Sequence, residues 1–335
     1  MSEPLISVII PVYNVEDYVV KCISSVVNQT LNDPIEIIVI DDCGEDNSIN
    51  LAKEYASTIH HDNRELIFLK HTQNRGQAAA RNTGVRIARG KFLFFIDSDD
   101  SIPTECLETF IDHTSQGEYD IIEGRSIHID STNKAASQIY NNQYNIVKEE
   151  ELWQIGGTWS PVCWNKLINR YFFIRHNLFF AEGFFYEDLY WAVLVALANP
   201  QILIIPNRTY YYSVRPGSTI NSMSERHVNS FIMLTKHLAV LYQNNNISIN
   251  FKSLFTANYE RFRSIAIDYV YAFCTNEMCK TMFNSLRELN LCSFSYILRN
   301  KSISAKTKIK VLPLYIGQLG HYLIILKSKI SKLFR

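Results

Sequence analysis

Cysteine is scarce in this sequence, and long apolar runs are missing. The 335 residues include seven cysteines, an odd number without paired spacing, which is typical of a protein from a reducing compartment and disfavours a disulfide framework. The N-terminus lacks a basic stretch followed by an apolar one, so we predict no signal peptide and a cytoplasmic location. No apolar segment reaches the roughly 20 residues of a transmembrane helix.

Net charge is also absent, because 33 Lys and Arg residues balance 33 Asp and Glu residues. A neutral chain gives no electrostatic reason to expect nucleic acid as a partner. Hydrophobic residues make up 47% of the chain and charged residues 20%, which allows a sizeable core and excludes a disordered protein. At this length we expect one large domain with a smaller additional part.

Acidic residues are missing after Glu288, and the C-terminal segment has the pattern of a basic amphipathic helix. Such a helix can lie on an anionic membrane surface, where each basic residue contributes about 1 kcal/mol. We therefore predict a peripheral protein on the inner face of the cell membrane; the alternative is a helix packed on protein. The apolar side comprises Tyr315, Leu319, Tyr322, Leu323, Leu326, Ile330 and Leu333, and the basic side Lys327, Lys332 and Arg335, with Lys329 near the boundary.

Short apolar strands alternate with helical segments over the first hundred residues. This alternation predicts an α/β fold with a mostly parallel sheet and helices on both faces. Ligands bind such sheets beyond the carboxyl ends of the strands. The predicted strands are Leu5–Pro11, Ile35–Ile40, Leu66–Lys70 and Lys91–Ile96, and the predicted helices are Glu16–Asn28, Ile49–Ala56 and Gly76–Arg89.

Beyond Pro103 the pattern is less regular. A further strand is predicted at Tyr119–Ile129, and two late strands, Ile202–Ile205 and Thr209–Tyr212, on either side of Pro206. From about Ser224 the sequence reads as helical. We therefore expect an α/β domain over residues 1–222 and a helical region over residues 223–335.

Acidic residues follow two of the predicted strands. Asp97-Ser98-Asp99 places two carboxylates one residue apart at a strand end, a pattern that suits Mg²⁺ or Mn²⁺ with its remaining positions left for diphosphate oxygens and water. Asp41, at the end of an early strand, could accept a hydrogen bond from a base or ribose. The alternative for both is an acidic turn on the surface. Arg75 and Arg81, near the start of the third helix, could meet phosphate, although surface arginines are common.

Five segments together resemble the family 2 glycosyltransferases of the GT-A fold. The resemblance runs in order over the first hundred residues, and one departure is that Cys43-Gly44 follows the paired aspartates where the family usually has glycine and then serine. The segments are SVIIPVYN (Ser7–Asn14), SVVNQT (Ser25–Thr30), VIDDCGEDNS (Val39–Ser48), NRGQAAARNTG (Asn74–Gly84) and ARGKFLFFIDSDD (Ala88–Asp100).

The resemblance implies an inverting hexosyl- or N-acetylhexosaminyltransferase that uses a nucleotide-activated sugar, usually a UDP-sugar, and a divalent metal. It divides residues 1–222 into a nucleotide-binding half, 1–100, and an acceptor half, 101–222. By the same resemblance the nucleoside would be held by Pro11, Val12, Tyr13 and Asp41, while Asp97 and Ser98 would lie near the ribose and Asp99, with Asp97, at the metal.

An acidic pair, Glu187-Asp188, lies within FYEDLYW. Inversion needs a base that takes the proton of the acceptor hydroxyl, and a positioned carboxylate supplies about 10²–10⁴-fold. The pair resembles the acceptor-side acids of the family, so we predict Asp188 as the base, with Glu187 orienting the acceptor or standing as the second candidate. The alternative is a pair of ordinary helix N-terminal acids.

Aromatic residues upstream of this pair suggest an acceptor platform. Trp159, Trp164 and Lys166 are the candidates, although core packing explains most aromatic residues in such a stretch. Arg215, in a segment that resembles the loop after the acid pair in bacterial relatives, is predicted to close over the diphosphate, or else is a solvated loop residue.

The sequence thus predicts a non-processive glycosyltransferase that acts on a saccharide or lipid-linked acceptor in bacterial capsule or O-antigen synthesis. A nucleotidyltransferase would carry a glycine-rich phosphate loop after the first strand, where this chain has Pro11-Val12-Tyr13-Asn14. A processive synthase would need membrane spans and a Gln-x-x-Arg-Trp motif. A non-catalytic carbohydrate-binding or scaffold protein of the same fold remains the alternative from another class.

Overall fold

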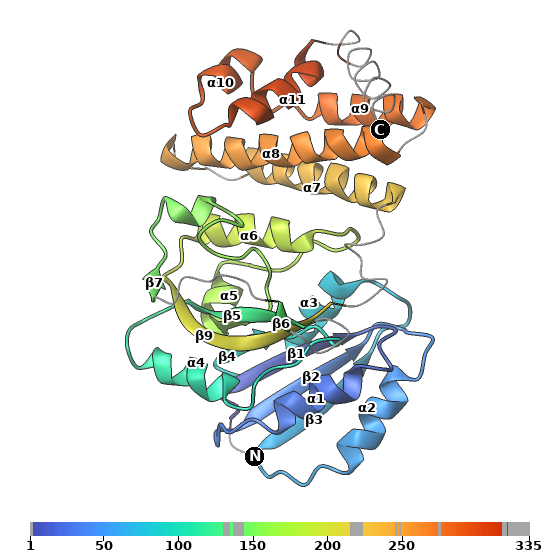
Figure 1. The fold of residues 1–335 in the computed structure, drawn as a ribbon, viewed down its shortest axis with the longest axis vertical. Coiled ribbons are helices and arrows are strands. Elements are labelled where there is room, and N and C mark those ends of the chain that lie inside the picture. The colour runs from blue at the N-terminus through green and yellow to red at the C-terminus, as the bar shows by residue number, and fades with distance from the viewer. Residues whose placement is uncertain are drawn as a thin grey trace. The chain divides into compact units, whose positions relative to one another are not determined.

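The computed structural model describes residues 3–129, 135–136, 144–214, 224–244, 247, 249–273, 276–316 and 320. The chain divides into two compact units, residues 1–183 with 194–216 and residues 184–193 with 217–335, whose elements are labelled in Figure 1. None of the described helices has both the length and the apolar character needed to span a bilayer. The predicted boundary between residues 222 and 223 falls outside the described residues and stays a prediction.

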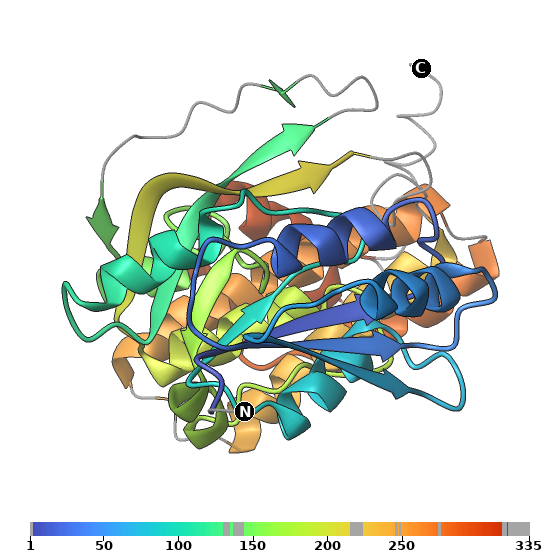
Figure 2. The ribbon, with the colours of Figure 1, turned by 90° about the horizontal axis from the view of Figure 1, so that it is seen from below.

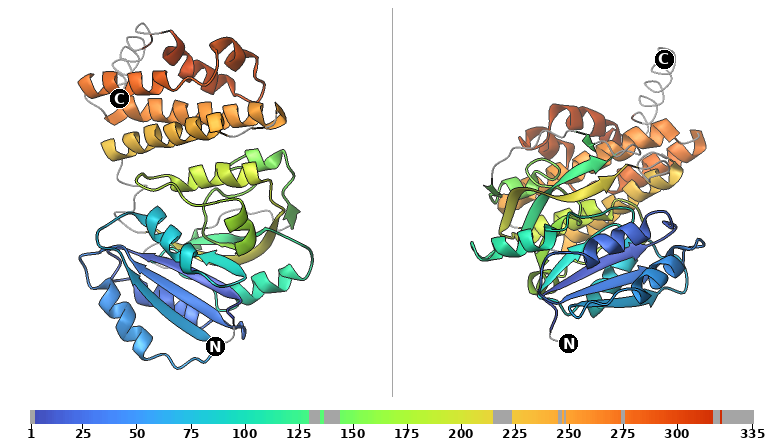
Figure 3. Two further views of the ribbon diagram at one scale, coloured as in Figure 1. Left: turned by 180° about the vertical axis from the view of Figure 1, so that it is seen from behind. Right: turned by 60° about the horizontal axis from the view of Figure 1, so that its bottom comes forward.

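The first unit is built on one sheet with strand order β3-β2-β1-β4-β8-β5-β9-β7, and β6 pairs with β5. Strands β3, β2, β1 and β4 pair in parallel, and β8 joins β4 and β5 in antiparallel. Figure 3 shows β1, β2 and β3 running side by side. The prediction of a mostly parallel sheet is confirmed. The strands are β1 (Ile6–Val12), β2 (Ile35–Asp41), β3 (Arg64–Lys70), β4 (Phe92–Phe95), β5 (Ile121–Ile129), β6 (Ala135–Ala136), β7 (Asn145–Ile146), β8 (Lys166–Asn169) and β9 (Ile202–Ser213).

Helices cover both faces of the parallel strands, which explains why β1 and β2 are buried along their whole length. Alternate residues of β1, such as Val8 and Ile10, share a core cluster with residues of α1 (Val19–Val27). On the other face, Gly84 of α3 (Gln77–Ile87) approaches Ile9 so closely that an added Cβ would lie 2.6 Å from its Cγ2. Figure 2 shows α1 and α2 (Ser48–Ser57) together on one face of these strands.

The two late strands predicted on either side of Pro206 are a single strand, β9, and that part of the prediction is wrong. The pairing of β9 with β5 shifts register on either side of Arg125. The strand therefore continues past Pro206 with an irregular pairing and does not end there. Proline lacks an N–H and is tolerated where no ladder bond is needed. Within the described residues, β7 pairs only with Leu203 and Ile204, which leaves Pro206 on an edge.

The remaining elements of the first unit are α4 (Cys106–Thr114), the 3₁₀ helix η1 (Glu151–Trp153) and α5 (Arg170–Arg175). The division between the units passes through α6 (Glu187–Ala198). The second unit is otherwise helical in its described part, as the sequence predicts. Its helices are α7 (Glu225–Asn244), α8 (Ile249–Phe273), α9 (Asn276–Glu288), α10 (Phe294–Arg299) and α11 (Ala305–Tyr315).

A buried polar network stabilises the helical unit. Arg263 of α8 is fully buried and binds Glu260 at 2.8 Å through Nη1, and the hydroxyl of Tyr315 donates to Glu260 at 3.0 Å. Tyr315, which the sequence places on the apolar side of a C-terminal amphipathic helix, is thus the last residue of α11 and contacts α8. The rest of that predicted helix lies outside the described residues apart from positions 316 and 320, so the membrane prediction is untested.

Candidate active site

The polar residues predicted to converge do follow neighbouring parallel strands. In the pairing of β1 with β2, Val12 lies opposite Asp41, and Ile9 of β1 lies opposite Phe95 of β4. Asp97 to Asp100 therefore leave the sheet at the same edge as Asp41. Pro11 and Val12 are buried, whereas 45% of Tyr13 is exposed. Such an edge is where ligands bind in sheets of this kind.

Asp41 closes the turn that follows β2. Its Oδ1 accepts hydrogen bonds from the backbone N–H groups of Cys43 at 2.9 Å and Gly44 at 3.4 Å, and Lys70 Nζ lies 3.4 Å from Oδ2. Cys43 has a φ of 61°, in the left-handed region that favours glycine. The departure from the family pattern at position 43 therefore places a cysteine in a backbone conformation that glycine adopts at a lower cost in free energy.

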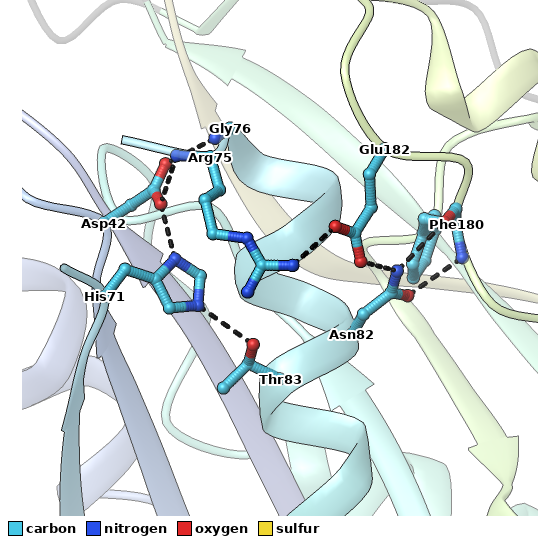
Figure 4. A network of polar contacts seen from close by, with 8 residues as sticks. All are labelled: Asp42, His71, Arg75, Gly76, Asn82, Thr83, Phe180 and Glu182. Carbon is cyan, nitrogen blue, oxygen red and sulfur yellow. Dashed lines mark hydrogen bonds and ion pairs between the residues drawn. The ribbon is translucent and has the colours of Figure 1, made fainter. Parts of the chain in front are cut away.

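Asp42, which the sequence analysis assigned no role, holds the loop before α3. Its Oδ1 accepts from the backbone N–H of Arg75 at 2.9 Å and from Nδ1 of His71 at 2.6 Å, and its Oδ2 accepts from the N–H of Gly76 at 2.7 Å. His71 Nε2 lies 2.9 Å from the hydroxyl of Thr83. Figure 4 shows these contacts, which tie β2 to α3 through a buried carboxylate.

The two predicted phosphate ligands differ in how they are held. Arg75 is partly exposed, and its Nη2 donates to Glu182 at 2.8 Å. Arg81 is buried, and its Nη2 donates to Asp97 Oδ1 at 2.6 Å. Arg81 thus fixes one carboxylate of the Asp97-Ser98-Asp99 motif, and its contact with phosphate stays a prediction.

The third aspartate of this segment has a structural role. Asp100 Oδ2 accepts from the hydroxyl of Tyr210 at 2.7 Å and Oδ1 from the N–H of Ser213 at 2.8 Å. Burial, together with the nearby charges of Asp99 and Asp97, raises the pKa of Asp100 well above its ordinary value. Asp100 therefore anchors this segment to β9.

The chemistry of Asp97 and Asp99 fits a divalent cation. Carboxylate oxygens are the donors that Mg²⁺ and Mn²⁺ prefer, and Mg²⁺ in particular is usually bound by one or two carboxylates, with substrate phosphates and water completing its shell. Within the described part of the chain, no three His, Cys, Asp or Glu side chains come together as a metal cage. A metal here would consequently depend on the diphosphate for its remaining ligands.

A polar pocket of about 290 Å³ lies beside the end of β4. Trp164 lines it, forms a bridge with Phe95, and stacks on Tyr210 with ring centroids 4.5 Å apart. Two other predicted acceptor ligands also border the pocket, but Trp159 is 1% exposed and its indole donates to Leu152 O at 3.0 Å. Lys166 is 0% exposed and pairs with Glu123 at 2.9 Å. Trp164 is therefore the candidate with accessible surface.

Glu187 and Asp188 begin α6 within the second unit, after a strained residue. Tyr186 has a φ of 68°, which is uncommon for a bulky side chain, and its ring packs on Phe231 with centroids 4.3 Å apart. Glu187 is 2% exposed, whereas Asp188 is partly exposed. Arg215, the predicted lid residue, lies outside the described residues.

The family model described as glycosyl transferase family 2 matches residues 7–176. The chain belongs to this family. The enzyme is 31% identical to the putative glycosyltransferase EpsH of Bacillus subtilis over 254 residues, which cover 73% of this chain and 71% of EpsH. It is a glycosyltransferase, as the sequence predicts.

Solved structures confirm the predicted GT-A fold of the enzyme. Residues 1–349 of S. aureus TarS, in complex with UDP-GlcNAc, match with a TM-score of 0.72 and 16% identity, covering 98% of this chain and 91% of the other. The mannosyltransferase PcManGT from Pyrobaculum calidifontis, in complex with GDP-Man and Mn²⁺, matches with a TM-score of 0.55 and 15% identity, covering 99% and 88%. At these identities the similarity speaks for the fold alone.

Proposed function

We propose that the enzyme transfers a sugar from a UDP-sugar, with inversion and without processivity, to a saccharide or lipid-linked acceptor in bacterial surface polysaccharide synthesis. The observation that carries the proposal is the shared edge of β1, β2 and β4, where Asp41 ends β2 and the Asp97-Ser98-Asp99 motif follows β4, the two strands that flank β1. The resemblance to bacterial family members, and the UDP-GlcNAc bound by TarS, support a uridine donor.

In this proposal the nucleoside lies against Pro11, Val12, Tyr13 and Asp41, with Asp97 and Ser98 near the ribose. Asp99, with Asp97, would hold Mn²⁺ or Mg²⁺, which supplies charge neutralisation for the departing diphosphate. Arg75, Arg81 and, from outside the described residues, Arg215 are the proposed phosphate-side cations. Trp164, together with Trp159 and Lys166, is proposed to line the acceptor site.

Asp188 is the proposed base. It would accept the proton of the acceptor hydroxyl while that oxygen displaces the nucleotide at the anomeric carbon. The difference in exposure supports this assignment, because a carboxylate that is partly exposed can meet an acceptor and the buried Glu187 cannot do so without rearrangement. Glu187 remains the second candidate, through orientation of the acceptor.

The C-terminal segment is proposed to bind an anionic membrane from the cytoplasmic side, which would bring the enzyme to lipid-linked acceptors. The composition of residues 315–335 supports this, since they contain basic but no acidic residues. Flotation of the full chain with anionic and with neutral vesicles tests it: binding to the anionic vesicles alone is expected, and equal recovery with both would contradict it.

The proposed chemistry is tested by UDP release from a panel of UDP-sugars, with Mn²⁺ and a membrane lipid extract as the source of acceptors. Asp188→Asn should lower transfer by about 10²–10⁴-fold while UDP still binds. Glu225→Gln is the matched control, because Glu225 is likewise an acid in the first turn of a helix. If Asp188→Asn transfers at the wild-type rate, the base assignment is wrong.

A further inference from the structure

Arg75 is held at its backbone and at one edge of its guanidinium. Its N–H donates to Asp42, and Nη2 donates to Glu182 at 2.8 Å (Figure 4). Within the described part of the chain, Nε and Nη1 of Arg75 make no hydrogen bond, and 42% of the side chain is exposed. One edge of the guanidinium is therefore fixed while the other remains able to donate to an anion.

Glu182 is itself fixed. Its Oε1 accepts from Nδ2 of Asn82 at 2.9 Å, and Asn82 also pairs with the backbone of Phe180, through O at 2.9 Å and N at 2.9 Å. Burial acts to raise the pKa of Glu182, but the hydrogen bonds from Asn82 and Arg75 outweigh it and hold the pKa below its ordinary value. Glu182 is thus a carboxylate at neutral pH, held on α3 by a buried amide.

The two amides just before α3 are taken up by Asp42. A helix N-terminus attracts anions through unpaired N–H groups, but Asp42 accepts the N–H groups of both Arg75 and Gly76. Arg81 is bound to Asp97. A phosphate arriving beside this loop would therefore meet the guanidinium of Arg75 and not these two amides.

We propose that Glu182 is a positioning residue for donor binding: it orients Arg75 so that the unoccupied edge of the guanidinium faces the diphosphate. The inference rests on the proposed function, in which Arg75 is a phosphate ligand. An arginine side chain loses rotamer entropy when it is immobilised. If a carboxylate fixes one edge of the guanidinium before the ligand arrives, less rotamer entropy is lost when the ligand binds.

The test is calorimetric titration of UDP with Mn²⁺ into the full chain. Glu182→Gln keeps an oxygen for Asn82 but turns the group facing Arg75 into a neutral amide. It should raise the Kd for UDP about twofold to fivefold, and Arg75→Gln should raise it about tenfold or more. In the double variant the effect of Glu182→Gln should disappear, because Glu182 acts through Arg75.

Glu65→Gln is the matched control, since Glu65 also pairs with an arginine, Arg89, in the same unit, and it should leave the Kd unchanged. An unchanged or lower Kd in Glu182→Gln overturns the inference, as does an additive double variant. A loss of binding sites at constant Kd would indicate a folding defect and also overturns it. If the wild type binds UDP and Arg75→Gln binds equally well, the proposed role of Arg75 is what fails.

Discussion

Replacing Asp42 by asparagine tests the claim that one buried carboxylate holds the loop before α3. Asp42 is 2% exposed and accepts three hydrogen bonds, from His71 and from the amides of Arg75 and Gly76. Hydrogen bonds to charged groups contribute about 1.5–3 kcal/mol each. Asparagine keeps one acceptor oxygen and points an amide N–H at a donor, so we expect a loss of about 3–5 kcal/mol, the size expected when about two hydrogen bonds to a charged group are lost.

Urea unfolding followed by tryptophan fluorescence is a suitable assay, because Trp153, Trp159 and Trp164 belong to the first unit and only Trp191 to the second. Glu54→Gln serves as the control: Glu54 is exposed on α2, and its substitution should change the free energy of unfolding by less than about 0.5 kcal/mol. A loss below about 1 kcal/mol in Asp42→Asn would refute the assigned role.

Three further substitutions have expected effects on stability, each measured by the same unfolding assay. Gly124→Ala should cost about 1–3 kcal/mol or more, because its Cβ would lie 1.8 Å from Thr209 Oγ1. Adding Thr209→Ala to the same chain should recover part of that loss, and no recovery would contradict the steric cause. Cys43→Gly should stabilise by about 0.5–1 kcal/mol, since relief of about 1–2 kcal/mol of left-handed strain exceeds the entropic cost of glycine; a net loss would show that the Cys43 side chain contributes a contact. Tyr210→Phe should cost about 1–3 kcal/mol by leaving buried Asp100 without its hydroxyl donor, and a neutral result would mean that water replaces the phenol.

The parallel sheet and its polar edge could be predicted from sequence because both depend on local patterns. Strands buried on two faces are continuously apolar, as β1 and β2 are, and the first polar residue after such a run marks the strand end. Asp41 and Asp97 were found in this way. The extent of β9 could not be predicted in this way, because a proline within an apolar stretch suggests that the strand ends. Only the strand pairing shows that Pro206 lies where its missing N–H is tolerated.

The role of Asp42 is indicated in the sequence by the glycine that precedes α3. Gly76, the residue before α3, has no side chain that could cap the helix, so amides at this helix start need acceptors from elsewhere in the chain. Asp42 meets part of this need, because it accepts the N–H of Gly76 together with that of Arg75 in the preceding loop. Backbone donors at a helix start without a side-chain cap therefore indicate a carboxylate such as Asp42 as their partner.

Long-range burial explains why the acceptor prediction was less informative. Trp159 and Lys166 belong to types that bind sugars and phosphates when exposed, and nothing in their neighbours in the sequence indicates that they are covered. The ion pair between Lys166 and Glu123 joins residues from β8 and β5, a contact that only the fold creates. Aromatic density in the sequence could therefore identify the segment but could not tell Trp164 from the buried residues.

The central claim is that the strand edge carrying Asp41 and Asp99 binds a uridine diphosphate together with a divalent cation. Its most direct test is calorimetric binding of UDP and of uridine, each with and without Mn²⁺, to the wild-type chain and to Asp99→Asn. Mn²⁺ should tighten UDP binding by about tenfold or more in the wild type and leave it unchanged in the variant, while uridine binds both alike. Tightening by Mn²⁺ that persists in Asp99→Asn, or a wild type that binds no UDP, would contradict the account.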